Sequence, residues 1–101
     1  MPMRKVRPRY PKKKDVAMAL RVLETLPKDA PLTMGWRFSE KHTPNFRIQG
    51  QIGRTDWTVD IYAGQYYIVR VGSRLGEECN SLSTAVAYIY RMLKIKRLSD
   101  V

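Results

Sequence analysis

The sequence predicts a small α+β domain in which one helix precedes and a second helix follows a three-stranded antiparallel sheet, with both helices packed on one sheet face. Apolar residues recur at helical spacing near both ends of the chain, and three segments between them alternate with a period of two. A length of 101 residues, 44% of them hydrophobic, suits one core and one domain. We expect a basic flexible arm at 1–14, the domain at 15–95 and a basic tail at 96–101.

The first helix is expected to run from Val16 to Leu26, with Asp15 as its N-cap and Pro27 as its stop. One stripe of this helix is apolar and consists of Val16, Ala19, Leu20, Leu23 and Leu26. Residues 27–35 contain two prolines and a glycine, which is typical of turns. Trp36 to Phe38 alternates once and predicts a short strand or a packing anchor.

Three alternating segments follow, joined by turns at 53–56 and 63–65, and they predict an antiparallel meander. The core-facing residues of these strands are expected to be Phe46, Ile48, Ile52, Trp57, Val59, Ile61, Tyr67, Val69 and Val71. Residues 72–80 are expected to form a loop. The second helix is expected from Leu82 to about Lys94, with an N-cap at one of Asn80, Ser81 or Ser83.

The predicted order of elements resembles the double-stranded-RNA-binding domain in topology, over about residues 15–94. That family places a lysine cluster at the start of its second helix to hold phosphates across a groove. Here residues 80–90 contain no lysine or arginine. Residues 57–59 and 84–88 are also faintly similar to the three-stranded sheet and helix of the AP2/integrase type. We assign the chain to neither family.

Positive charge is concentrated at the two ends of the chain. The chain has 19 lysines and arginines against 9 acids, a net charge of +10. Residues 1–14 carry +7 and residues 91–101 carry +3, so residues 15–90 are neutral. Crowded like charges repel one another until a counter-charge arrives, so this segregation favours a polyanionic partner over a merely solvated tail.

Two groups of residues are candidates for nucleic-acid contacts. The cations at the chain ends would bind phosphates: Arg4, Lys5, Arg7, Arg9, Lys12, Lys13, Lys14, Arg91, Lys94 and Arg97. The outward sheet face would contact bases, because arginine and glutamine pair with base edges and tyrosine stacks on unpaired bases: Arg47, Gln49, Gln51, Tyr62, Tyr66 and Arg70. Asp60 on the same face favours an ordinary solvated surface instead.

Few residues of the sequence are suited to catalysis. Cys79 and His42 are the single cysteine and the single histidine, too few for a zinc site, and neighbouring acids would raise the pKa of the Cys79 thiol. Asp56 and Asp60 would lie ~13 Å apart on a strand, too far to share a metal ion. We expect no catalysis, no cofactor, no metal and no membrane contact. With no apolar signal segment after the basic N-terminus, we expect a cytoplasmic protein, or a nuclear one in a eukaryote.

The sequence therefore predicts a non-catalytic nucleic-acid-binding module, with DNA or RNA undecided and the protein either a monomer or a homodimer. The alternative is a small protein-binding or inhibitory module of the kind that phages or mobile elements encode. Such a module would dock on a host protein or nucleoprotein complex and would set its basic arm against an acidic surface.

Overall fold

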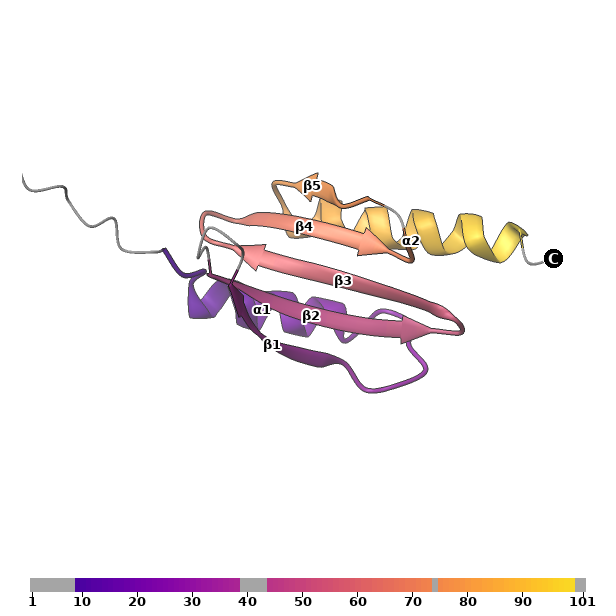
Figure 1. Ribbon diagram of the computed structural model, residues 1–101, viewed down its shortest axis with the longest axis horizontal. Helices are drawn as coiled ribbons and strands as arrows, with labels where there is room; N and C mark the ends of the chain where they lie inside the picture. Colours follow the sequence, from indigo (N-terminus) through magenta and orange to yellow (C-terminus); the bar gives the residue numbers. More distant parts are fainter. Residues whose placement is uncertain (1–8, 39–43, 74, 100–101) are drawn as a thin grey trace, which may run out of the picture.

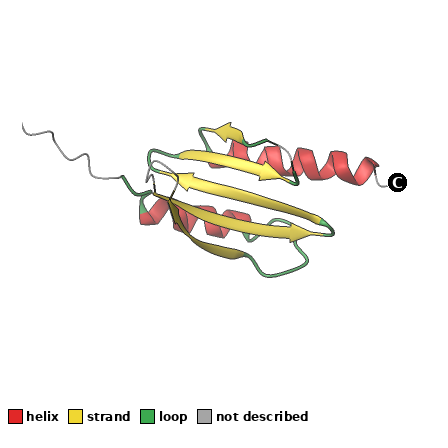
Figure 2. Cartoon of the chain, viewed as in Figure 1, coloured by secondary structure: helices red, strands yellow, loops and turns green. Residues whose placement is uncertain are grey.

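The computed structural model describes residues 9–38, 44–73 and 75–99, with side chains up to Lys94 (Figures 1 and 2). Two helices and five strands make up this part of the chain, and they confirm the predicted α+β class. In chain order these elements are α1 (Lys13–Leu23), β1 (Thr33–Phe38), β2 (Pro44–Ile52), β3 (Thr55–Tyr62), β4 (Tyr66–Val71), β5 (Glu77–Cys79) and α2 (Leu82–Ser99).

All five strands form one antiparallel sheet in the order β1-β2-β3-β4-β5. The prediction of three strands therefore missed β5, and it gave β1 only as one of two alternatives, a short strand or a packing anchor at residues 36–38. Residues 33–38 pair along their whole length with residues 44–49 of β2, although the composition of 33–35 predicts a turn. Residues 77–79, expected in a loop, pair with Tyr67 to Val69 of β4. Backbone pairing with a formed neighbour is sufficient to hold short edge strands that carry little alternation of their own.

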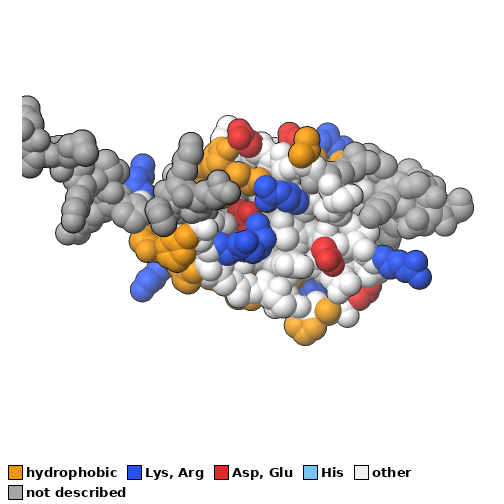
Figure 3. Space-filling view, viewed as in Figure 1, with side chains coloured by type: hydrophobic (Ala, Val, Ile, Leu, Met, Phe, Trp, Pro, Cys, Tyr) orange, Lys and Arg blue, Asp and Glu red, His pale blue; other side chains and the backbone are white. Residues whose placement is uncertain are grey.

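One face of the sheet carries the core, and both helices lie behind the sheet in the view of Figure 1. Trp57, Val59 and Ile61 of β3 are all fully buried, as the alternation predicted. They join one apolar cluster with buried side chains of both helices: Ala19, Leu23, Ala85, Ile89, Met92 and Leu93. The opposite sheet face is open to solvent and is turned toward the reader in Figure 3.

Gly50 is the strand position at which the core leaves no room for a side chain. It lies opposite Trp57 in the β2–β3 pairing. A Cβ atom at residue 50 would stand 2.2 Å from Cζ2 and 2.3 Å from Cε2 of Trp57. The absent side chain therefore leaves room for the Trp57 ring against residue 50, with the ring Nε1 buried without a hydrogen-bond partner.

Both helices differ in length from the prediction. α1 begins at Lys13, two residues before the expected cap, because the extended Lys12 already accepts the first helical hydrogen bonds from the backbone N–H groups of Asp15 and Val16. Asp15 lies instead in the first turn, where its negative charge interacts favourably with the positive end of the helix dipole. α2 continues to Ser99, past the expected end near Lys94. Ser81 caps α2, since its Oγ accepts a hydrogen bond from the Thr84 N–H at 3.2 Å.

Candidate nucleic-acid interface

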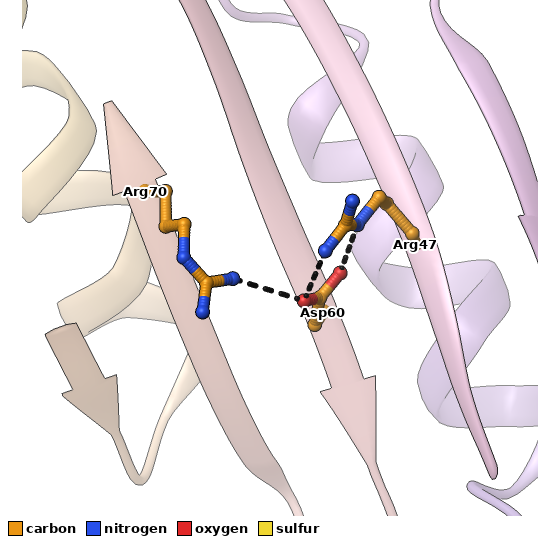
Figure 4. A network of polar contacts seen from close by, with 3 residues as sticks. All are labelled: Arg47, Asp60 and Arg70. Carbon is orange, nitrogen blue, oxygen red and sulfur yellow. Dashed lines mark hydrogen bonds and ion pairs between the residues drawn. The ribbon is translucent and has the colours of Figure 1, made fainter. Parts of the chain in front are cut away.

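The predicted base-contacting residues do lie together on the open sheet face, but an acid lies among them. Asp60 of β3 is only 3% exposed, and its carboxylate accepts hydrogen bonds from Arg47 Nε at 2.6 Å and Arg47 Nη2 at 2.9 Å. A longer contact of 3.4 Å comes from Arg70 Nη1 on β4 (Figure 4). The hydrogen bonds to Asp60 raise the pKa of Arg47 above its already high ordinary value. Three of the donors that base recognition would need are therefore engaged within the protein.

The remaining predicted members of the open face lie on either side of this trio. Tyr62 and Tyr66 are paired across β3 and β4, and their rings pack edge to face with centroids 5.7 Å apart. Burial, followed by the charge of Asp60, raises the pKa of Tyr62. Gln49 lies near the middle of β2, whereas Gln51 is close to the β2–β3 turn. The six residues share a face, and Arg47, Arg70 and Tyr62 gather around Asp60.

The basic N-terminal segment is attached to the domain where α1 begins. Arg9, Lys12, Lys13 and Lys14 are all exposed, and no ion pair involves them within the part of the chain that the structure describes. Pro11 between them is buried, and the neighbouring Tyr10 ring packs edge to face against Trp36, with centroids 5.5 Å apart. We call these four residues the N-terminal cations. Arg4, Lys5 and Arg7 lie outside the described residues.

Strand β1 presents large apolar side chains that the sequence did not predict as functional. Trp36 is 49% exposed and Phe38 is 59% exposed, although both have the parity of the core-facing side chains. We call Tyr10, Trp36 and Phe38 the aromatic edge. Apolar side chains gather beside lysines and arginines at the end of the sheet near the start of α1 (Figure 3). The alternation of residues 36–38 predicted a short strand or a packing anchor here, but it did not indicate that the rings are exposed.

A shallow depression of about 220 Å³ adjoins the aromatic edge. Trp36 and Met34 line it together with Arg37, Arg47 and Gln49, around the open position of Gly35. A Cβ atom at Gly35 would have no heavy atom within 4 Å. Two predicted residues, Arg47 and Gln49, therefore share the open face with Arg37, which the sequence did not single out, whereas the Trp36 ring has the opposite parity.

The cations of α2 lie at the other end of the molecule. Arg91 and Lys94 are exposed and line a cleft of about 1180 Å³ together with Arg54 of the β2–β3 turn. Tyr90 and Leu93 form part of its apolar lining. Arg91 also lies over the ring of Tyr88, 5.6 Å from its centroid. The start of α1 and the end of α2 point to opposite ends of the domain (Figure 1), so the two basic regions do not form one surface. The side chain of Arg97 lies outside the described residues.

The Cys79 thiol was also considered, from the sequence, as a reactive or metal-binding group. Cys79 is 2% exposed in β5, and burial, followed by the charge of Glu77, raises the pKa of its thiol. His42 lies outside the described residues. Over the described ranges, no group of three or more histidine, cysteine, aspartate or glutamate side chains is placed to hold a metal ion. In the same part of the chain no helix has the length and apolar character needed to cross a membrane.

Comparisons with protein-family models, curated proteins and solved structures give no match to this chain. The function must therefore be inferred from the surface itself.

Proposed function

We propose that this chain is a non-catalytic nucleic-acid-binding module that holds phosphates mainly through its N-terminal cations. The observation that supports this proposal is the grouping of Arg9, Lys12, Lys13 and Lys14 beside the exposed aromatic edge, all of them exposed and without an ion pair among the described residues. Surface cations that serve only solubility are usually interspersed with acids. Here four cations within six residues have no acid among them, and they flank rings able to stack on bases.

The structure also supports a rank among the predicted contacts. The N-terminal cations come first because their charges are uncompensated. Arg91 and Lys94, with Arg54, form a smaller second region at the far end. Arg47 and Arg70 come last because Asp60 cancels one of their two charges and occupies their donors. Binding by this arrangement is largely independent of base sequence, since phosphates dominate the contacts.

A salt titration tests the proposal. Each neutralised phosphate contributes about −0.9 to the log–log salt slope on duplex DNA and about −0.7 on single strands. Replacing all four N-terminal cations by alanine should therefore flatten the slope by roughly 3 to 4 units. Fluorescence anisotropy with labelled oligonucleotides of random sequence measures this. Arg21→Ala removes one exposed charge from the same helix outside the cluster, and it should change the slope by less than about 1 unit.

Two results would contradict the proposal. One is the absence of measurable binding to DNA and RNA at moderate salt by the intact chain. The other is an equal slope for the fourfold alanine variant and the intact chain. Alanine replacement is preferable to deleting residues 1–14, because Pro11 is buried, Tyr10 contacts Trp36, and α1 begins at Lys13.

A second candidate function is docking on another protein, and one observation favours it. β1 is an edge strand of the sheet, and three of its side chains, Met34, Trp36 and Phe38, are each about half exposed. An edge of this kind can accept an added strand from a partner, with main-chain hydrogen bonds and apolar anchors. The basic residues nearby would then face an acidic partner. Affinity capture with and without nuclease separates this function from the first.

A further inference from the structure

We infer that the β1 edge binds unpaired bases, so that the partner is a single-stranded nucleic acid with bases on Trp36 and Phe38 and phosphates on the neighbouring cations. This inference depends on the proposed nucleic-acid binding and adds to it the class of nucleic acid and the position of the bases. It assigns a role to residues of β1 that the charge pattern of the sequence did not indicate.

The two exposed rings of β1 lie on one side of the strand. Trp36 and Phe38 are two positions apart, which separates their Cα atoms by about 6.8 Å. Trp36 packs edge to face against Tyr10 and Phe46 and is still 49% exposed. Phe38 is 59% exposed, so each ring has open surface on which a base can stack. The bases of a duplex are already stacked on one another and cannot enter such a site. Only unpaired bases can use it.

The charges around the aromatic edge match a strand whose phosphates run alongside. Tyr10 ties Arg9 and Lys12 to Trp36 on one side. Arg37 alternates with the two rings along β1 and is exposed on the open face of the sheet. Asp60, the acid buried in that face, is occupied by Arg47 and Arg70. Positive charge therefore lies on both faces of β1, with the N-terminal cations on the side of the rings.

The same charges disfavour a second copy of this chain as the occupant. Pairing β1 with β1 of another molecule would bring two sets of N-terminal cations and two Arg37 side chains together. Like charges in such a contact repel. The depression around Gly35 lies on the opposite, open face of β1, beside Arg37 and Gln49, and it is not part of this base site.

Tryptophan fluorescence gives a direct test, because the chain has two tryptophans in different settings. Trp36 is 49% exposed and Trp57 is 0% exposed. Binding of an oligodeoxythymidylate should quench the Trp36 emission and leave that of Trp57. The Trp36→Phe variant, which retains only Trp57, should then show little quenching although it still binds.

Affinity measurements separate base contacts from phosphate contacts. Trp36→Leu should weaken binding of oligodeoxythymidylate by roughly 5- to 150-fold, the effect of losing one stacked base. It should leave the salt slope unchanged, and it should leave binding of an abasic oligonucleotide of the same length unchanged. Trp36→Phe should retain most of the affinity. Met34→Ala, at a side chain of similar exposure on the same strand, should change binding by less than about 3-fold because it has no ring to stack.

A variant at Gly35, on the other face of β1 from the two rings, serves as a control for the base site. Gly35→Val keeps every charge and ring, suits a strand, and places its branched side chain in open space. It should leave the binding of oligodeoxythymidylate and of the abasic oligonucleotide nearly unchanged, because its side chain points away from Trp36 and Phe38. Melting curves show whether each variant folds, and Phe38→Leu replaces Trp36→Leu if the latter does not.

The outcomes distinguish the base site on β1 from the proposed nucleic-acid binding through phosphates. Equal binding of thymidylate and abasic oligonucleotides, with no effect of the Trp36 or Phe38 changes, would overturn the base site and leave phosphate binding intact. Tighter binding of duplex than of single strands would also overturn it. A dimer or a protein complex that these substitutions disrupt would show that the edge has a different occupant. Failure to bind any oligonucleotide would overturn the proposed function itself.

Discussion

Replacing Gly50 by alanine should destabilise the domain, because the core has no room for the added methyl group. The new Cβ atom would lie 2.2 Å from Trp57 Cζ2, at least about 1.2 Å inside the 3.4 Å at which ordinary contacts begin. The Trp57 ring is 0% exposed and is enclosed by the core, so it has no free space to move into. Overpacking of this kind costs about 1–3 kcal/mol. For a domain of this size that corresponds to a fall in Tm of roughly 4–24 °C.

Gly35→Ala is the matched control, since it adds the same methyl group to the same sheet where no heavy atom lies within 4 Å. Its Tm should stay level or rise slightly, because alanine restricts the unfolded chain. Trp57→Phe removes the atoms with which the methyl group collides. The double variant with Gly50→Ala should therefore lose less stability than the two single changes added together. Thermal unfolding followed by circular dichroism measures these four variants and the intact chain. Equal Tm values for Gly50→Ala and Gly35→Ala would refute the reasoning.

Three further predictions concern other parts of the domain. Asp60→Asn should lower the free energy of unfolding by about 1–3 kcal/mol in urea titrations, because it weakens charged hydrogen bonds, and unchanged stability would show that the Arg47 contacts contribute nothing. Ser81→Ala removes the cap of α2 and should lower the free energy of unfolding by about 1 kcal/mol. Ser83→Ala is the control, because it removes a hydroxyl that does not cap the helix. Because burial raises the pKa of the Cys79 thiol above its ordinary 9.0, the unfolded chain ionises first. The stability that Cys79 contributes is therefore complete below about pH 9 and is lost as the pH rises through the folded value. Cys79→Ala should show a smaller loss of stability as the pH rises above about 9, and parallel pH curves would contradict this.

The central strands could be predicted because their apolar faces are fully buried. Trp57, Val59 and Ile61 alternate with polar residues, and this pattern alone determines which side faces the core. β5 could not be predicted in this way, since Glu77 and Glu78 precede a single buried residue, Cys79. Its pairing comes from β4, a neighbour that only the folded chain supplies.

The candidate site was predictable in composition but not in arrangement. The sequence shows where cations lie, and it predicted the shared face of Arg47 and Arg70 correctly. It could not show that Asp60 lies between them, since that depends on the register of three strands. It also could not show the exposure of Trp36. The position of Trp36 in the alternation of the strand predicts a buried ring. The ring is half exposed because β1 lies at the edge of the sheet.

The open edge of β1 also affects how this protein behaves in concentrated solution. An apolar edge strand invites pairing between copies, and mutual repulsion at a net charge of +10 opposes it. Salt shortens the range of that repulsion, from about 10 Å at 0.1 M to about 3 Å at 1 M. We therefore expect the chain to stay dispersed in dilute buffer and to self-associate at high ionic strength. Light scattering across a salt series would show whether the charges that we propose bind the partner also keep the copies apart.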